Sequence, residues 1–220
     1  MQSAVVVFPG SNCDRDLAEA IYLVSNSKCK MLWHKETLLP KKLDILFIPG
    51  GFSFGDYLRC GAIAAASPIM KSVLNFAQNG GYIIGICNGF QILTETGLLK
   101  GTLLRNSNLN FICKPQKLIV NNCKSILTKS FFDGEQLELP IAHHDGNFFA
   151  EDEILRSLEG NGQVILRYED NPNGSKNNIA GIMSENGRVI GLMPHPERAV
   201  DQSLSSADGL KIFNSLVNVF

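Results

Sequence analysis

The stretch at Gly80–Leu93 reads GGYIIGICNGFQIL. Its apolar run, Tyr82–Ile86, has the length and composition of a strand buried on both faces of a parallel sheet. After Cys87 the apolar side chains recur at helical spacing, and Gly97 is placed to end that helix. The stretch therefore predicts a buried strand that passes, through a sharp turn at Cys87, directly into a helix.

The first half of the chain repeats this alternation of strand and helix. Short apolar runs predict further strands at residues 4–9, 29–34 and 44–51, and apolar periodicity predicts helices at residues 13–24 and 67–78. Asp14 is placed to cap the first of these helices. Apolar strands that alternate with helices indicate an α/β fold with a mostly parallel central sheet flanked by helices.

The second half has a different pattern. Runs joined by turns predict an added antiparallel β patch at residues 109–122 and 135–149, then strands within residues 163–169 and 179–197 and a closing helix at residues 207–220. The turn-rich segment 169–178 predicts a mobile surface loop. Because no linker, repeat or low-complexity tract interrupts the chain, we expect residues 1–220 to form a single domain.

Composition excludes several classes of protein. The 220 residues are 45% hydrophobic and carry a net charge of −1, so no basic field favours nucleic acid. The apolar runs are too short to span a bilayer, and the first ten residues lack the features of a signal peptide. We therefore expect a cytoplasmic protein with no membrane contact and six free thiols. No C-x-x-C pair occurs, and no metal site is expected.

Cys87 is the candidate nucleophile. Gly85 and Gly89 bracket it in the G-x-nucleophile-x-G pattern of a strand-to-helix elbow, where bulkier neighbours would clash. The partial positive charge at the start of the following helix favours a thiolate, and the Asn88 N–H is placed to stabilise a carbonyl oxyanion. The alternative is a buried structural cysteine at the end of a strand.

Cys13 is the rival nucleophile, because it too follows a predicted strand and precedes a helix. Asp14 and Asp16 beside it would oppose a thiolate. It also lacks the two flanking glycines. These differences favour Cys87.

A nucleophilic cysteine needs a general base and a group that orients the base. His195 follows an apolar strand in GLMPHPERA, and the prolines on either side fix its backbone. Glu197 lies two residues on, so in an extended segment its carboxylate points the same way and would hold the imidazole. Among the other histidines, His34 ends a predicted strand, and we expect it to be partly exposed and structural. His143 and His144 remain alternative bases.

The segment Pro49–Asp56, PGGFSFGD, predicts a second element of the site. It is a strand end that opens into glycines, and a parallel sheet places such ends at one edge. A backbone N–H from this segment would be a second oxyanion donor. The alternative is a tight turn between strand and helix with no further role.

These motifs resemble those of the class I, triad-type glutamine amidotransferases: GICNGFQIL resembles their nucleophile motif, and MPHPE their His-Glu pair. Further blocks, FPGSNCDRD, IPGGFSFGDYLRCGAIAA and IAHHDGNFF, are similar to those of the glutaminase subunits of phosphoribosylformylglycinamidine synthases. The likeness runs from Phe8 to Ala199. It implies a flavodoxin-like fold and an enzyme that hydrolyses L-glutamine through a cysteine thioester, supplying ammonia for de novo purine biosynthesis.

The resemblance also implies a role for individual residues. It assigns Cys87 as nucleophile, His195 as general base and acid, Glu197 as orienter, the N–H groups of Gly51 and Asn88 as the oxyanion hole, and Gln91 as a neighbour of bound glutamine. The chain departs from the family pattern at His144 and Asp145, where a small residue and a glutamate are expected.

The chain contains no G-x-x-x-x-G-K-[ST] phosphate loop. The resemblance therefore implies that this chain binds no cofactor, and that ATP and Mg are used by a large synthetase subunit, with a small third subunit completing the complex. Three other interpretations stay open. They are a glutaminase subunit of another ATP-dependent synthetase, a partner-independent cysteine γ-glutamyl hydrolase, and a flavodoxin-like binding module in which Cys87 is only redox-active.

Overall fold

The computed structural model describes residues 1–203 and 206–220. The strands are β1 (Ser3–Val7), β2 (Lys30–Trp33), β3 (Ile45–Ile48), β4 (Tyr82–Ile86), β5 (Thr102–Leu104), β6 (Ile112–Val120), β7 (Gln136–His143), β8 (Asn147–Phe149), β9 (Val164–Tyr168), β10 (Ile179–Met183) and β11 (Val189–Leu192). The helices are α1 (Asp14–Ser25), α2 (Ala62–Ala65), α3 (Met70–Gln78), α4 (Asn88–Glu95), α5 (Asp152–Gly160) and α6 (Asp208–Val217), with 3-10 turns η1 (Ser53–Asp56), η2 (Lys176–Asn178) and η3 (Pro196–Arg198). In these residues no helix has the length and apolar character needed to span a bilayer.

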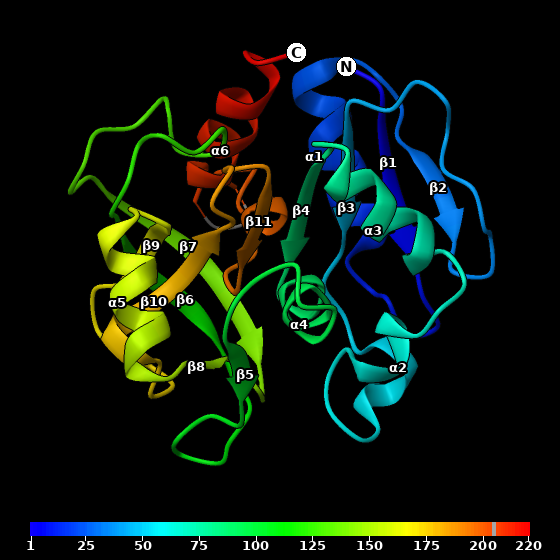
Figure 1. The fold of residues 1–220 in the computed structure, drawn as a ribbon. Helices are drawn as coiled ribbons and strands as arrows, with labels where there is room; N and C mark the ends of the chain where they lie inside the picture. Colours follow the sequence, from blue (N-terminus) through cyan, green and yellow to red (C-terminus); the bar gives the residue numbers. More distant parts are fainter. Residues whose placement is uncertain (204–205) are drawn as a thin grey trace.

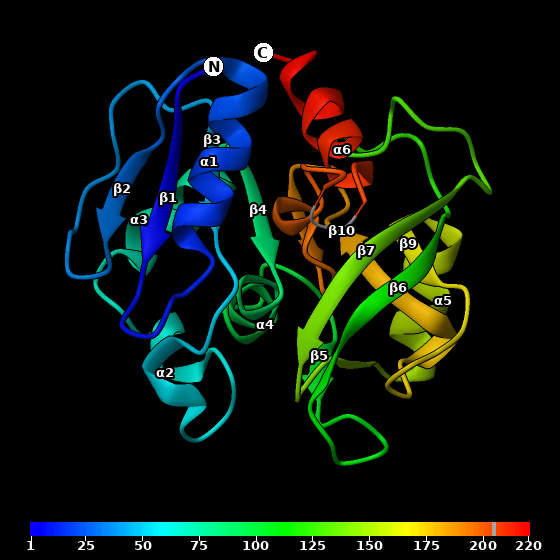
Figure 2. The ribbon, with the colours of Figure 1, turned by 180° about the vertical axis from the view of Figure 1, so that it is seen from behind.

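Within the described residues, nine strands form one sheet in the order β2-β1-β3-β4-β11-β10-β9-β6-β7. The pairing is parallel from β2 to β11 and antiparallel from β11 to β7. Helices α3 and α5 cover one face of the sheet, and α1 and α6 cover the other (Figures 1 and 2). The predicted α/β class is confirmed, and the antiparallel patch continues the central sheet. Strands β5 and β8 form a separate antiparallel ladder.

Three segments leave the parallel half of the sheet at one edge. Ile86, the last residue of β4, pairs with Leu192 of β11, and Gly85 pairs with Ile48 of β3. Because neighbouring parallel strands run in the same direction, the residues that follow these three strands emerge side by side. In Figure 1 this edge lies beside α4, whereas both chain termini lie at the opposite end of the molecule.

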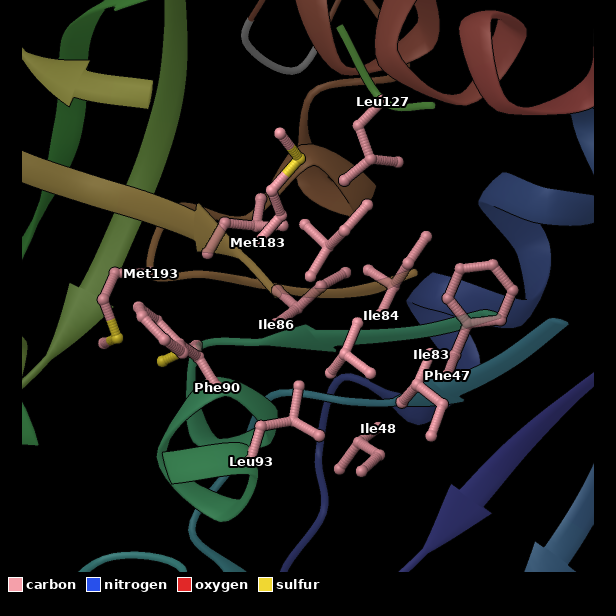
Figure 3. Close-up of a cluster of buried hydrophobic side chains, with 14 of the residues drawn as sticks. Phe47, Ile48, Ile83, Ile84, Ile86, Phe90, Leu93, Leu127, Met183 and Met193 are labelled. Atoms are coloured by element: carbon pink, nitrogen blue, oxygen red, sulfur yellow. The ribbon is translucent and has the colours of Figure 1, made fainter. Parts of the chain in front are cut away.

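Helix α4 packs tightly onto the centre of the sheet. Figure 3 shows Phe90 and Leu93 of this helix beside the strand residues Ile48 and Ile86. All four side chains are buried, and burying each of them stabilises the fold by roughly 1.5–3 kcal/mol. Phe90 also stacks on Phe148 of β8, with ring centroids 6.0 Å apart. This contact joins the small ladder to the main core.

Some elements differ from the sequence-based expectation. The sequence does not predict helices α2 and α5 or strand β5. All three are short, and α5 buries only Leu155 and Leu158, so its apolar pattern is weak. The expected cap of α1 is wrong: Cys13 is the residue before the helix, and no side chain caps it. Asp14 is instead the first helical residue, where its charge still lies near the positive end of the helix.

One expectation about exposure is also wrong. His34 is buried rather than partly exposed, because its ring packs against Trp33 and Phe54 at centroid distances of 4.5 and 5.2 Å. The segment 169–178 is mostly exposed, as expected of a surface loop, but Asn173 within it is fully enclosed and hydrogen-bonded. In both places a residue distant in the sequence contributes to the burial: Phe54 at His34 and Gly146 at Asn173.

We expect Gly89→Ala to destabilise the protein. Alanine normally favours a helix over glycine by roughly 0.5–1 kcal/mol. At this position, however, the added Cβ would lie 2.0 Å from the backbone oxygen of Ile48. The clash should lower the free energy of unfolding by about 2 kcal/mol, as overpacking of a core does. Urea unfolding followed by circular dichroism measures the change.

Gly160→Ala is the matched control, because no heavy atom lies within 4 Å of a Cβ added at this helical position. It should leave the free energy of unfolding unchanged or raise it slightly. If Gly89→Ala behaved like the control, the close approach of α4 to β3 would be refuted.

Candidate active site

Cys87 occupies the turn between β4 and α4 in a strained backbone conformation. Its φ is 50° and its ψ −104°, a combination that costs on the order of 1–3 kcal/mol. The flanking glycines make the turn possible, because a Cβ atom on Gly85 would lie 2.6 Å from the backbone of Gly89. The Cys87 N–H donates to the Leu192 carbonyl at 2.7 Å. The structure thus has the elbow geometry that the glycine spacing predicts, with β11 holding it in place.

His195 and Glu197 form a buried pair just beyond the end of β11. Nδ1 of His195 lies 2.6 Å from Oε1 of Glu197. Burial alone would lower the pKa of His195, but attraction to Glu197 and Cys87 outweighs burial and raises this pKa well above its usual value. The other ring nitrogen, Nε2, has no hydrogen-bond partner among the described residues. It is therefore available to accept or donate a proton.

Cys13, the rival nucleophile, packs against the same imidazole. A Cβ atom on Gly50 would lie 2.7 Å from Cε1 of His195 and 3.2 Å from Sγ of Cys13, so both side chains lie over this glycine. Burial raises the pKa of Cys13, which keeps its thiol protonated and poorly nucleophilic. Burial, rather than the charges of Asp14 and Asp16, is the reason.

Cys13, His195 and Glu197 also form the one group of three or more residues in the described part of the chain whose potential metal-ligand atoms lie within 4.8 Å of one another. The imidazole and the carboxylate, however, are 2.6 Å apart. Two ligands bound at about 2.0–2.2 Å to a tetrahedral zinc ion are separated by roughly 3.3 Å. The geometry therefore suits a shared proton better than a metal ion.

The two expected oxyanion donors lie on adjoining segments. Asn88 begins α4, and Gly51 follows β3 with a φ of 139°, which favours glycine. Neither N–H donates a hydrogen bond to any residue that the structure describes. The Asn88 side chain joins the two segments, because its Oδ1 accepts the Ser53 N–H at 3.3 Å. Both donors are thus free, at the edge where Cys87 lies.

Gln91 is buried behind the elbow. Its Oε1 accepts from Nδ2 of Asn88 at 2.8 Å, and its Nε2 donates to the Asp145 carbonyl at 2.7 Å. Both ends of the side-chain amide are therefore engaged within the protein. Gln91 therefore links α4 to the segment that follows β7.

A pocket of about 520 Å³ lies between the segment after β3 and the segment after β7, and Cys87 is not among the residues that line it. Asp56 on its wall accepts a hydrogen bond from Nδ2 of Asn88 at 3.3 Å, which connects the pocket to α4. Burial raises the pKa of Asp56 to about 6, against an opposing hydrogen bond from Cys60 and with added repulsion from Asp145. The wall carries charges of both signs and an apolar rim: Asp56, Asp145, Arg59, Arg105, Phe52, Leu58, Leu104 and Phe111.

The alternative bases, His143 and His144, have different surroundings. Nδ1 of His143 lies 3.1 Å from Oδ1 of Asn106. Burial and the charge of His195 lower the pKa of His143 to about 4, so this ring is neutral near pH 7. His144 points to a backbone carbonyl of a neighbouring loop instead. These contacts favour His195 as the base.

The structure places three polar side chains around the site for which the sequence predicts no role: Asn106, Asn173 and Asp56, the last of which ends the predicted segment Pro49–Asp56. All three lie in segments rich in glycine, asparagine and serine, where such residues are typical of turns. No local pattern distinguishes them from ordinary loop residues.

Comparisons with known proteins find relatives that match nearly the whole chain. A family model described as a CobB/CobQ-like glutamine amidotransferase domain matches residues 1–218. The chain is 57% identical to the phosphoribosylformylglycinamidine synthase subunit PurQ of Roseobacter denitrificans, covering 98% of this chain and 97% of the relative. It is 53% identical to the same subunit of Lacticaseibacillus paracasei, covering 99% and 95%. A chain in the structure of PurLQS from Thermotoga maritima is 44% identical, with a TM-score of 0.89 and coverage of 99% and 98%.

Ionised Asp56 should destabilise the fold. The pKa of Asp56, about 6 in the folded protein, lies above its usual value of 3.8. The folded state therefore holds an extra proton between these values, and stability falls as pH rises through 6. Asp56→Asn keeps an oxygen for the Asn88 amide. We expect it to raise the free energy of unfolding at pH 8 by about 1 kcal/mol, discounted for partial exposure, and to have little effect near pH 4.

Urea unfolding at a series of pH values measures this difference. Asp170→Asn is the control, because Asp170 is an exposed loop carboxylate; it should change stability little at any pH. An equal gain for Asp56→Asn at pH 4 and pH 8 would contradict the assignment.

Proposed function

The chain belongs to the CobB/CobQ-like glutamine amidotransferase family, and we propose that it is the glutaminase subunit of a phosphoribosylformylglycinamidine synthase. It hydrolyses L-glutamine to glutamate and ammonia. A synthetase partner uses the ammonia and ATP to convert formylglycinamide ribonucleotide to formylglycinamidine ribonucleotide in de novo purine biosynthesis. The observation that best supports this reaction is that the strained Cys87 elbow and the buried His195–Glu197 pair lie at the same edge of the sheet. The relatives at 57% and 53% identity support the pathway.

The first half of the reaction forms a thioester. His195 accepts the Cys87 thiol proton, and the sulfur attacks the side-chain amide carbon of glutamine. The N–H groups of Asn88 and Gly51 stabilise the negative charge that develops on the carbonyl oxygen. His195 then donates its proton to the amide nitrogen, the C–N bond breaks, and ammonia departs.

The second half hydrolyses the thioester. Nε2 of His195 accepts a proton from water while the water oxygen attacks the thioester carbon. The C–S bond breaks, glutamate is released, and Cys87 recovers its proton. Throughout, the 2.6 Å hydrogen bond from Nδ1 to Glu197 fixes the tautomer and stabilises the imidazolium.

The pocket between the segments after β3 and β7 suits the amino-acid head group of glutamine. Its carboxylates, Asp56 and Asp145, match the α-ammonium group, and the guanidinium group of Arg105 matches the α-carboxylate. The guanidinium group of Arg59 is already paired with Glu95. Gln91 supports this binding from behind, through its hydrogen bond to the Asp145 carbonyl.

The name PurLQS of the similar Thermotoga maritima structure supports a large synthetase subunit, PurL, and a small third subunit, PurS, as partners. We assign ATP and Mg to the synthetase, assign no cofactor to this chain, and place the complex in the cytoplasm. Ammonia released into water at neutral pH becomes ammonium, which is not a nucleophile. Direct transfer to the partner avoids this loss.

A glutamine-analogue electrophile should label Cys87, as located by mass spectrometry of peptides. Cys87→Ser should lower glutamate release by at least about 1,000-fold, because nucleophile and base act as a unit. Cys13→Ser is the matched control, since Cys13 is a second buried thiol against the same imidazole; it should keep most of the activity. Labelling of Cys13 or Cys60 would refute the assignment, and no labelling would favour the non-enzymatic binding module.

The synthetase should accelerate glutamate release by this chain. Gly50 and Gly51 let the second oxyanion donor reorient at little steric cost, and one such donor contributes about 100- to 1,000-fold in rate. We expect an increase of that size when synthetase, ATP, Mg and acceptor are added together. ATP and Mg without the synthetase should change nothing. Equal rates with and without partner would favour the partner-independent hydrolase.

A further inference from the structure

Residues 142–146, which we name the elbow-side turn, contact both the nucleophile and the helix behind it. The Ala142 carbonyl accepts from Sγ of Cys87 at 3.6 Å. The Asp145 carbonyl accepts from Nε2 of Gln91 at 2.7 Å. Any group that fixes this turn therefore also fixes one side of the active site.

Asn106 makes four hydrogen bonds to the elbow-side turn, through its backbone N–H and both ends of its side-chain amide. Its N–H donates to the His144 carbonyl at 2.9 Å, and its Nδ2 donates to the His143 carbonyl at 3.0 Å. Its Oδ1 accepts from Nδ1 of His143 and from the Gly146 N–H, each at 3.1 Å. The second Nδ2 hydrogen goes to the Asn110 carbonyl at 2.8 Å. The side-chain amide is therefore saturated, and its orientation is fixed.

The ring of His143 and the backbone of Gly146 pack as one unit. A Cβ atom on Gly146 would lie 2.5 Å from Nδ1 of His143, so only glycine fits beneath the ring. Asn173 closes the unit from the other side, because its Nδ2 donates to the Gly146 carbonyl at 2.8 Å and lies 3.5 Å from Nε2 of His143. Asn106 and Asn173 are both fully enclosed. No water competes for these hydrogen bonds, so losing one leaves a buried group unpaired.

We propose that Asn106 is a positioning residue for glutamine hydrolysis. By fixing the elbow-side turn, it holds the Ala142 carbonyl against Cys87 and the Asp145 carbonyl against Gln91, although it does not line the pocket. The inference rests on the proposed function and gives the turn a role within it. A displacement of about 1 Å at a reacting group costs about 100-fold in rate, so a few buried hydrogen bonds control the activity.

The test compares Asn106→Ala with Asn110→Ala in the full chain bound to its synthetase. Asn110 is the matched control, because it is exposed in the same loop and, among the described residues, its side chain hydrogen-bonds only to Asn108. We expect Asn106→Ala to lower kcat/KM for glutamine about 100-fold, with at least a threefold rise in KM. A protein that is merely less stable would lose folded material and apparent kcat but keep its KM. Asn110→Ala should stay within twofold of the unmodified chain.

Asn106→Asp is the second variant, in case Asn106→Ala fails to fold. It keeps the oxygen that accepts from His143 and Gly146. Because the second oxygen is buried against the His143 and Asn110 carbonyls, the carboxyl group should stay protonated and donate to one of these two carbonyls, where Asn106 donates to both. It should therefore fold and show an intermediate loss of kcat/KM with the same rise in KM. A folded Asn106→Ala or Asn106→Asp with both kcat and KM within threefold of the control would overturn the proposal.

A measurement without glutamine separates this inference from the proposed function. Amide hydrogen exchange should speed up in residues 142–146 of the variants and not in α3 or β1, and iodoacetamide should alkylate Cys87 several-fold faster once the turn loosens. If the unmodified complex released no glutamate, the proposed function would fail while these two rates still tested the role of Asn106. Unchanged exchange and alkylation in the variants would refute it.

Discussion

The parallel pairing of β4 with β11 is the constraint on which the rest of the site depends. Ile86 lies opposite Leu192, so Cys87 and His195, more than one hundred residues apart in the chain, leave the sheet beside each other. The register of β4 against β11 is fixed, because shifting either strand by one residue would turn its side chains to the other face of the sheet. Gly191 adds a steric reason: a Cβ there would lie 2.1 Å from the Phe90 ring. Strand, elbow and helix therefore pack as one unit.

In this arrangement, the imidazoles of His195 and His143 lie near each other but have different roles. His195 has a carboxylate partner, Glu197, which raises its pKa, whereas the pKa of His143 is lowered to about 4 by burial and by the charge of His195 itself. One ring therefore moves protons, and the other remains a neutral hydrogen-bonding group. The same low-dielectric surroundings that strengthen the His195–Glu197 pair prevent a second positive charge beside it.

The sequence is most informative where a short stretch determines its own structure. The run at Tyr82–Ile86 and the helix at Asn88–Glu95 have the bounds that apolar periodicity predicts, and the glycine spacing identifies the elbow because the clash is local. Asn106 could not be found this way. An asparagine between short strands is typical of a turn, and its partners lie about forty residues further along the chain. The burial of His34 likewise depends on Phe54, which reaches it from a different loop.

The positions of the two termini have a practical consequence. Both lie at the end of the molecule opposite α4 (Figure 1), because the parallel strands carry the chain away from its start before the elbow is reached. Affinity tags, fluorescent fusions or surface attachment at either end consequently leave the carboxyl edge unobstructed. An immobilised chain would present that edge outward, which makes it suitable for capturing interacting proteins by biosensor without re-engineering the fold.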